Sequence, residues 1–449
     1  MTEPVVVIGG DAAGMSAASK VKREAPDTEV IVFEKGEWVS YAACGMPYYV
    51  KGDIEELDDL VAVTPEEFRE ERGVDLRTGH EVVDIDPESE TVTVTNDRET
   101  FEQSYGTLLI ATGASAVEPP FGGMDLDGVF TLHDMDEAGE IDRYIDERGP
   151  ESAAIVGGGY VGIEMAEALD ERGIDVTLYE MLPQVLAPFG EAVGNRVGDH
   201  LREQGVDLHL ETAVDGFSGE RAVEAVETED GRQPAELVVV GVGVEPNTTL
   251  AEAAGIELGE TGAIAVDEYG RTNVENIYAA GDCAEATNVV TGKPDHVPLA
   301  LTANRAGRAI GQTITGTPQP VGEIAGTAIV KAFDLGAART GILDEERASD
   351  AGFEPVSVTI DTASRAHYYP GASELTVTLV ADGPSGRVLG ASLVGREGAK
   401  RIDTVATALT AELTVGELQG ADLAYAPPFS PVWDPVLTAA KVLGSKLDS

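Results

Sequence analysis

Two segments of the chain repeat one order of hydrophobic and glycine-rich positions. The first segment starts with the apolar run 5–8, and the second starts with the apolar run 153–156. In each copy a glycine-rich turn follows, then a helical stretch, then a second short apolar run at 29–33 or 175–179. Short, uninterrupted apolar runs that flank a helix are typical of buried parallel strands. The pattern therefore predicts two strand–turn–helix–strand units.

The turn of each unit has the glycine spacing of a dinucleotide-binding loop. Glycines let the backbone turn tightly and bring N–H groups close to a pyrophosphate, and the following helix N-terminus favours negative charge. An acidic residue ends each second strand, Glu34 at 20 residues after Gly14 and Glu180 at 18 residues after Gly162. At that distance such units bind a ribose hydroxyl. One position departs from the pattern, because Asp11 replaces the middle glycine of the first loop and its carboxylate must point away from a pyrophosphate.

After about residue 325 the pattern changes. Residues 374–380 alternate between apolar and polar positions, which is typical of an antiparallel strand with one buried face. Turn residues separate this stretch from a second strand at 387–394, and a helix is expected at about 399–413. We predict an α/β protein with two Rossmann-like dinucleotide-binding domains and a C-terminal α+β domain that has an interface role.

The chain is strongly acidic, with 81 Asp and Glu residues, 30 Lys and Arg residues and a net charge of −51. This charge excludes general affinity for nucleic acid or for anionic membranes. The acidic residues are spread along the whole chain, which indicates a solvated surface in a medium where salt screens self-repulsion. We infer a salt-accumulating cytoplasm, of the kind found in halophilic archaea.

No membrane or export segment is expected. The sequence contains no run of about 18 apolar residues, the length that spans a bilayer. The N-terminus leads into an apolar strand without a basic region, so we expect no signal peptide and a cytoplasmic protein.

The two cysteines, Cys44 and Cys283, are too few for a disulfide framework, and the 6 histidines lack ligand spacing, so no metal site is expected. Cys44 precedes Gly45-Met46-Pro47, which suits the start of a helix. A helix N-terminus lowers the pKa of a thiol, so we expect Cys44 to be a reactive thiolate rather than a buried small residue. We expect Cys283 to be such a buried residue.

Cys44 has no cysteine partner close by in the sequence. The positions five residues away are Val39 and Tyr49, so Cys44 cannot close a local disulfide. An oxidised Cys44 must therefore be a mixed disulfide with a small thiol or a sulfenic acid.

Two further motifs identify a family. Residues 107–114 (Thr-Leu-Leu-Ile-Ala-Thr-Gly-Ala) and 272–282, which end in Ala-Ala-Gly-Asp, resemble the closing strand and the second FAD motif of the two-dinucleotide-binding-domain flavoproteins, which include glutathione reductase. The resemblance covers essentially the whole chain. The single-cysteine branch is the most similar, and it contains coenzyme A disulfide reductases, NADH oxidases and NADH peroxidases.

The resemblance implies three domains: an FAD-binding domain at 1–117 and 246–324, an NAD(P)H-binding domain at 118–245 and a dimerisation domain at 325–449. The first unit would bind FAD, and the second NADH or NADPH. Glu180 would repel a 2′-phosphate, and no Arg or Lys follows within several residues, which favours NADH.

The resemblance also carries over three sets of residues. The expected FAD-binding residues are Gly9, Gly10, Ala12, Ala13, Gly14, Glu34, Lys35, Ala111, Thr112, Gly113, Gly281 and Asp282, of which the last would contact the ribityl chain. The expected NAD(P)H-binding residues are Gly157, Gly159, Tyr160, Val161, Gly162, Glu180 and Gly243. The expected residues for the thiol substrate are Ser40, Ala43, Lys20, Arg23, Asn304 and Arg305.

Single positions distinguish the members of this branch. NADH oxidases and peroxidases carry a His in the first glycine-rich loop where this chain has Ala12, so the chain is more similar to the coenzyme A disulfide reductases. That branch places groups for coenzyme A phosphates at Lys20 and Arg23, although these residues equally suit a solvated basic patch. The branch often has Asn before its cysteine, and Ala43 stands there.

Two tyrosine segments resemble parts of these reductases that reach the cysteine of the partner subunit. They are 368–371 (Tyr-Tyr-Pro-Gly) and 425–430 (Tyr-Ala-Pro-Pro-Phe-Ser). A phenol of Tyr425, Tyr368 or Tyr369 could give a proton to a departing thiolate, or these aromatics could simply pack beside the prolines. The resemblance implies a homodimer with a shared active site.

The resemblance implies reduction of coenzyme A disulfide by NAD(P)H through FAD, with coenzyme A expected on Cys44 as a mixed disulfide. One alternative keeps the scaffold and changes the acceptor to oxygen, peroxide or polysulfide. Another is an electron-transfer or redox-sensing flavoprotein with a protein partner. No nucleic acid or membrane partner is expected.

Overall fold

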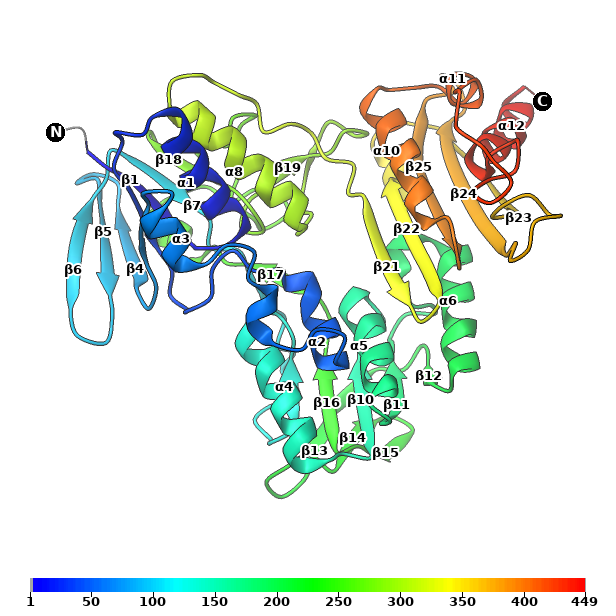
Figure 1. Cartoon of the computed structure of the whole chain (residues 1–449), viewed down its shortest axis with the longest axis horizontal. Helices are drawn as coiled ribbons and strands as arrows, with labels where there is room; N and C mark the ends of the chain where they lie inside the picture. The colour runs from blue at the N-terminus through cyan, green and yellow to red at the C-terminus, as the bar shows by residue number, and fades with distance from the viewer. Residues whose placement is uncertain (1–2, 449) are drawn as a thin grey trace.

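A parallel sheet forms the first nucleotide-binding unit (Figure 1). The computed structural model describes residues 3–448. In this sheet β1 lies between β2 and β7, so the first predicted strand is central. The strands, in the order of the sheet, are β18 (Ile277–Ala279), β7 (Thr107–Ile110), β1 (Val5–Ile8), β2 (Val30–Phe33) and β3 (Asp75–Arg77).

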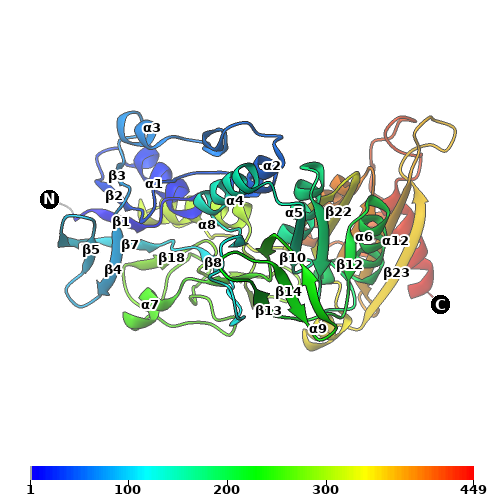
Figure 2. The ribbon, with the colours of Figure 1, turned by 90° about the horizontal axis from the view of Figure 1, so that it is seen from below.

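Helices α1 (Ala12–Glu24) and α8 (Ala300–Ile314) lie side by side on this unit (Figures 1 and 2). Their backbones come close because α8 has glycine where it crosses α1. A Cβ at Gly307 would lie 2.1 Å from the carbonyl oxygen of Ala13, and a Cβ at Gly311 would lie 2.6 Å from that of Ala17. This close packing fixes the start of α1, where the first glycine-rich loop ends.

A small antiparallel sheet completes the first unit. Its apolar side chains, Val92 and Val94 among them, pack in one cluster with Ile8 and Ile110 of the parallel sheet. The strands are β4 (Glu81–Asp86), β5 (Thr91–Thr95) and β6 (Thr100–Ser104).

A second parallel sheet repeats the design. Its central strand β10 (Ser152–Val156) pairs with β11 (Asp175–Tyr179), so the second predicted unit is present. The sheet also contains β12 (Asp207–His209), β16 (Leu237–Val240) and β9 (Val129–Thr131). Its main helices are α4 (Met135–Arg148), α5 (Tyr160–Glu171) and α6 (Glu191–Gln204).

The chain crosses between the two units twice, and the two crossings are paired. Strand β8 (Ala114–Ala116) forms an antiparallel ladder with β17 (Val244–Pro246). Beside the ladder, Thr112 Oγ1 donates to the carbonyl oxygen of Asn247 at 2.8 Å, and Asn247 Nδ2 donates back to the carbonyl oxygen of Thr112 at 2.9 Å. The two crossings are therefore held together next to a loop predicted to bind FAD.

The C-terminal part forms an antiparallel sheet covered by helices, as Figure 1 shows. The strands, in the order of the sheet, are β21 (Ala328–Ala332), β22 (Leu335–Gly341), β25 (Val388–Gly395), β24 (Glu374–Asp382) and β23 (Pro355–Ala363). The larger helices are α10 (Ile402–Thr410) and α12 (Pro435–Leu447). Helix α6 of the second unit packs against this sheet.

The short helix α2 (Met46–Lys51) comes from the first unit but packs against α4 and α5 of the second. Its buried residues Met46 and Val50 belong to the same hydrophobic cluster as Ile163 and Leu169 of α5. The segment that follows Cys44 is therefore held by the second unit, which the sequence did not predict.

The predicted α/β class, with two parallel units and a C-terminal α+β part, is confirmed. The last predicted helix begins as a single 3-10 turn (Ala399–Arg401) and becomes α-helical only in α10, which ends at Thr410. The three domain ranges stay predictions, and each of the three large sheets falls within one of them. Among residues 3–448, no helix is long and apolar enough to cross a membrane.

Candidate active site

The two glycine-rich loops have the same backbone geometry. Gly9 has φ of +109°, and a Cβ there would lie 2.0 Å from the carbonyl oxygen of Ala111. Gly157 has φ of +106°, and its Cβ would lie 2.4 Å from the carbonyl oxygen of Gly241. A side chain fits at neither position, so both loops keep the bare backbone that a pyrophosphate requires.

The acid that ends the second strand of each unit closes the loop. Glu34 accepts hydrogen bonds from the N–H groups of Gly10 and Gly36, both at 2.7 Å. Glu180 accepts from the N–H groups of Gly158 at 2.7 Å and Leu182 at 2.8 Å. Each carboxylate is fixed in place and still has free lone pairs for a ribose hydroxyl.

Asp282 lies three residues after the end of β18, in the second predicted FAD motif. Its carboxylate accepts no hydrogen bond from residues 3–448, while its carbonyl oxygen lies 2.8 Å from Nε2 of His296. Burial raises the pKa of the Asp282 carboxyl, and the nearby His296 and His133 oppose this effect. A half-buried carboxylate without a partner suits a hydroxyl-rich ligand, so the residues of the first unit fit FAD, and the contact of Asp282 with the ribityl chain stays a prediction.

The other predicted cofactor residues lie around the same loops. Ala12, Ala13 and Gly14 begin α1, and Tyr160, Val161 and Gly162 begin α5. The remaining ones lie in loops, where Lys35 and Gly243 are exposed and Gly159 caps α5. Their individual roles stay predictions, as do those of Ala111, Thr112, Gly113 and Gly281.

Asp11 is turned toward the loop that carries the cysteine. Its Oδ1 accepts a hydrogen bond from the N–H of Tyr41 at 3.2 Å. Burial raises the pKa of Asp11 to about 6, although hydrogen bonds from the backbone of Ala12 and Tyr41 oppose the rise. The departure from the glycine pattern therefore links the first loop to the cysteine loop.

Cys44 lies in a single 3-10 turn (Ala43–Gly45) before α2, and its side chain is exposed in the single chain. The loop before it is held on both sides. Ser40 N–H donates to the carbonyl oxygen of Gly10 at 3.0 Å, and Ala42 N–H donates to that of Leu60 at 2.8 Å. Ser40 also has φ of +49°, a left-handed conformation that non-glycine residues rarely adopt. The loop therefore fixes Cys44 beside the first glycine-rich loop.

The expectation of a lowered thiol pKa is wrong. Although Cys44 is exposed at the surface, the atoms packed around its sulfur exclude part of the water and raise the pKa of the thiol, and the charge of Glu164 raises it further. A 3-10 turn followed by the six-residue α2 gives a weak partial positive charge, which does not outweigh the two effects.

Glu164 is a site residue that the sequence did not reveal. It lies on α5, and its Oε1 accepts a hydrogen bond of 3.0 Å from the hydroxyl of Tyr48, four residues after Cys44. Burial raises the pKa of Glu164 to about 7, and the charge of Glu167 adds to the rise while the Tyr48 hydrogen bond opposes it. A carboxyl that titrates near neutral pH therefore lies close to the cysteine loop.

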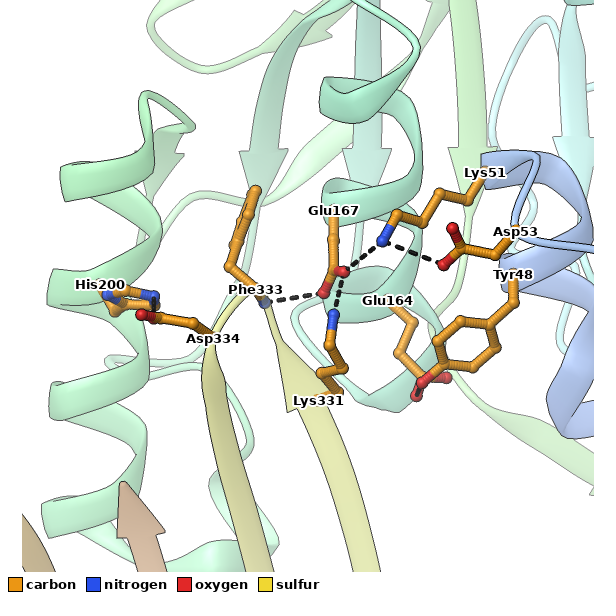
Figure 3. A network of polar contacts seen from close by, with 9 residues as sticks. All are labelled: Tyr48, Lys51, Asp53, Glu164, Glu167, His200, Lys331, Phe333 and Asp334. Carbon is orange, nitrogen blue, oxygen red and sulfur yellow. Dashed lines mark hydrogen bonds and ion pairs between the residues drawn. The ribbon is translucent and has the colours of Figure 1, made fainter. Parts of the chain in front are cut away.

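Glu167, one turn further along α5, is held by two ammonium groups (Figure 3). Lys51 Nζ donates to its Oε1 at 2.9 Å, Lys331 Nζ binds the same oxygen, and the N–H of Phe333 donates to Oε2 at 2.7 Å. Burial opposes ionisation, but the hydrogen bonds from Lys331 and Lys51 outweigh it and lower the pKa of Glu167. Glu164 and Glu167 could have been noticed in the sequence as two charged residues, three positions apart, within an otherwise apolar helix.

The residues predicted for the thiol substrate differ in how much they are exposed to solvent. Lys20 is only 7% exposed and its ammonium lies 2.5 Å from Glu24, so it is not part of a solvated patch, whereas Arg23 is exposed. On α8, Asn304 Oδ1 accepts from Ser16 Oγ at 2.5 Å, and Arg305 is exposed. Ser40 and Ala43 flank the cysteine loop, and both are half-buried.

The three predicted tyrosines lie on the C-terminal domain and are not brought to the Cys44 of the same chain. Tyr368 is 70%, Tyr369 36% and Tyr425 59% exposed. Both views show the β23–β24 end of this domain apart from α2 (Figures 1 and 2). Phe429 and Trp433, which follow Tyr425 within the next eight residues, are also exposed, at 77% and 53%.

Cys283 has no exposed surface, and its thiol contacts the carbonyl oxygens of Ile110 and Ala280. The prediction of a buried small residue is confirmed. Cys44 is therefore the exposed thiol of the described chain.

Two dinucleotide-type loops and an exposed thiol, whose own loop is hydrogen-bonded to the first of them, are typical of a nucleotide-dependent redox enzyme. Comparison with protein families agrees: residues 3–307 match the model described as pyridine nucleotide-disulphide oxidoreductase, and residues 327–435 match its dimerisation domain. The chain belongs to the pyridine nucleotide-disulphide oxidoreductase family and is an FAD-dependent NAD(P)H oxidoreductase.

Several known proteins are similar over nearly the whole length of this chain. The NAD(P)H coenzyme A polysulfide/persulfide reductase of Pyrococcus horikoshii is 41% identical over 444 residues, which cover 99% of either chain. The coenzyme A disulfide reductase of Staphylococcus haemolyticus is 33% identical and covers 95% of this chain and 96% of its own. The solved structure of an NAD-dependent persulfide reductase from A. fulgidus superposes with a TM-score of 0.96 at 41% identity, covering 99% of this chain and 83% of that one.

Proposed function

We propose that this enzyme reduces coenzyme A disulfide with NAD(P)H, through FAD and a mixed disulfide on Cys44. The observation that carries the proposal is an exposed thiol next to the first glycine-rich loop, while Cys283 is buried in the sheet core. A single accessible thiol stores oxidising equivalents only with an external partner, such as a small thiol.

Bound FAD supplies transfer of two electrons from NAD(P)H to the sulfur centre. The Cys44 thiolate attacks one sulfur of coenzyme A disulfide, which forms the Cys44–S–S–coenzyme A bond and breaks the S–S bond of the substrate. The departing coenzyme A thiolate takes a proton from a tyrosine hydroxyl. Two electrons then break the mixed disulfide and regenerate the Cys44 thiolate with a second coenzyme A. In total one NAD(P)H, one proton and one disulfide give NAD(P)⁺ and two thiols.

We place this site between two subunits. The tyrosines Tyr368, Tyr369 and Tyr425 are exposed, and all three lie within residues 327–435, the range that matches the dimerisation domain. A symmetric dimer presents the same surface twice, so each aromatic surface would meet the cysteine loop of the partner subunit. One of these tyrosines is the proposed proton donor.

The preferred nucleotide is NADH. Glu180 is fixed by two backbone N–H groups at the ribose position, where its negative charge would repel a 2′-phosphate. The next two residues, Met181 and Leu182, are exposed and apolar and supply no cation to bind a phosphate. We also place the enzyme in a salt-rich cytoplasm, because its acidic surface requires screening.

A second candidate substrate is a persulfide or polysulfide of coenzyme A. The higher identity to a relative named polysulfide/persulfide reductase than to a relative named disulfide reductase supports it. Cys44 would attack the coenzyme A sulfur, and hydrogen sulfide would leave in place of a thiol. The absence of a histidine at Ala12 disfavours the peroxide alternative.

The test compares Cys44→Ser with the unchanged enzyme in three assays under NADH: thiol release from coenzyme A disulfide, sulfide release from coenzyme A persulfide, and oxygen consumption. We expect the variant to lose thiol or sulfide release and to keep bound FAD. Undiminished disulfide and persulfide reduction by the variant would refute the proposal, and the ratio of thiol to sulfide release decides between the two substrates.

A further inference from the structure

Helix α2, which begins two residues after Cys44, contacts the rest of the molecule mainly through side chains of the second unit. Tyr48 binds Glu164, Lys51 binds Glu167, and Arg172 Nη1 donates to the carbonyl oxygen of Val50 at 2.7 Å. All three of these partners belong to α5 or to the residue that caps it. The position of Cys44 therefore depends on α5 as well as on its own loop.

Glu167 is a nearly buried carboxylate, so its charge requires partners. Its side chain is 5% exposed and the Lys51 side chain is 14% exposed, so the pair lies largely away from water. Both Lys51 and Lys331 bind the same carboxylate oxygen of Glu167 (Figure 3). Without this carboxylate Lys51 would keep Asp53 as its ion-pair partner, and Lys331 would lose the buried carboxylate that draws it toward α5, so Glu167 holds Lys331 and shares in holding Lys51.

The contacts of Glu167 join three parts of the molecule. Lys51 ends α2, Glu167 lies on α5, and Lys331 and Phe333 belong to β21 and the turn after it. The charges at this junction balance. The two ammonium groups of Lys51 and Lys331 are matched by the carboxylate of Glu167 and by that of Asp53, which lies 3.1 Å from Lys51.

The β21–β22 turn is also fixed from its other side. Asp334 lies 2.8 Å from Nε2 of His200 on α6 and 2.8 Å from Nε of Arg396. The ring of Phe333 lies against the ring of His200, with the centroids 6.2 Å apart. The turn is thus held between α5 and α6, and a displacement of the C-terminal sheet would reach Glu167 through Lys331 and Phe333.

We propose that Glu167 is a positioning residue for Cys44: it anchors the end of α2 through Lys51 and couples that helix to the C-terminal sheet through Lys331 and the Phe333 N–H. The inference rests on the proposed role of Cys44 as the redox thiol. In the proposed dimer the C-terminal domain also carries the tyrosines, so this junction would set the position of the cysteine relative to them.

The first test measures Cys44 without any turnover. The rate of Cys44 alkylation by iodoacetamide is followed by mass spectrometry, together with amide hydrogen exchange of residues 44–53, in the FAD-loaded protein. In Glu167→Gln we expect both rates to rise about fivefold or more, because the buried partner of two lysines is lost and α2 opens locally. The uncompensated positive charge also favours the thiolate, so both effects act in the same direction.

Matched variants separate positioning from general loss of stability. Glu171→Gln makes the same change at an exposed site on the same helix and should behave as the unchanged protein. Lys51→Met should reproduce Glu167→Gln and Lys51→Arg should restore slow alkylation, because Arg keeps the ion pair. A merely structural role of Glu167 would lower the melting temperature without this rescue.

The coupling to the C-terminal domain has its own variant. Lys331→Met does not touch α2, yet we expect it to accelerate exchange at 44–53 about twofold or more because Glu167 loses one of its anchors. Lys400→Met, at a lysine 81% exposed, is the control. If Glu167→Gln and Lys51→Met leave alkylation and exchange unchanged, the positioning role is wrong; if only Lys331→Met is silent, the coupling to the C-terminal sheet is wrong. Neither outcome depends on the substrate, whereas the proposed function fails separately if Cys44→Ser keeps turnover.

Discussion

The most specific electrostatic prediction concerns Glu164 and the reactivity of Cys44. Glu164 binds Tyr48, which follows Cys44 by about one helical turn, and its charge raises the pKa of the thiol. Replacing Glu164 by Gln removes that charge and keeps an acceptor for the Tyr48 hydroxyl. The pKa of Cys44 should therefore fall, and its thiolate should be more abundant at a given pH.

The size of the effect depends on the separation of the two charges. Glu164 binds the hydroxyl of Tyr48 and its charge acts on Cys44, so we take a separation on the order of 7 Å between the thiolate and the carboxylate. Two unit charges at about 7 Å interact by about 2 kcal/mol at an effective dielectric constant near 20, and partial contact with water reduces this to about one pKa unit. We expect alkylation of Cys44 in Glu164→Gln to be about tenfold faster at pH 8.

The pH dependence of Cys44 alkylation in the unchanged enzyme should also report the interaction between Glu164 and Cys44. The pKa of Glu164 is about 7, so its charge appears as the pH rises through that value and then opposes thiolate formation. The logarithm of the alkylation rate should therefore rise less steeply around pH 7 than above or below it. Glu164→Gln should give a straight profile, and Glu171→Gln is the control at an exposed position. Superimposable profiles for Glu164→Gln and the unchanged enzyme would show that Glu164 does not act on Cys44.

Three further predictions concern the nucleotide, the first loop and the solvent. Glu180→Ala with Leu182→Arg should raise kcat/KM for NADPH relative to NADH by about tenfold or more, because the repelling charge is replaced by a cation; an unchanged ratio would locate the ribose elsewhere. Asp11→Asn should stabilise the protein by up to about 3 kcal/mol at pH 8, because the charged Asp11 is penalised by burial above its pKa of about 6; the gain should vanish as the pH falls from 6 to below 4, and the melting temperature at several pH values checks this. Raising KCl from about 0.1 M to about 2 M should raise the melting temperature, because salt screens the net charge of −51; a falling melting temperature would contradict the proposed salt-rich setting.

The fold could be predicted from the sequence because its signals are local. The strands at 5–8 and 175–179 and the helices after both glycine-rich loops appear where the pattern indicated them. Gly9 and Gly157 are required by the backbone itself. A Cβ atom at either position would lie within 2.4 Å of a carbonyl oxygen. Such a steric requirement fixes the residue type at one position as glycine, so it can be detected in a single sequence.

The charged surroundings of Cys44 could not be predicted in the same way. Glu164 is 120 positions from Cys44, and Lys331 is 280 positions from Lys51, so no local spacing connects them. The sign of the thiol pKa was wrong because a local signal, the helix start, was used alone, whereas burial and a distant carboxylate decide it. The position of Lys20 was missed for a similar reason, since its burial depends on the packing of α1 against α8.

The central claim is that Cys44 carries the substrate as a mixed disulfide, and one mass measurement tests it directly. The FAD-loaded enzyme is incubated with coenzyme A disulfide without NADH, digested and analysed, and the same sample is then treated with NADH. We predict one coenzyme A per chain, located on the peptide with Cys44, and its release as free coenzyme A after NADH is added. An enzyme that turns over the disulfide without forming this adduct, or an adduct that NADH does not remove, would contradict the account.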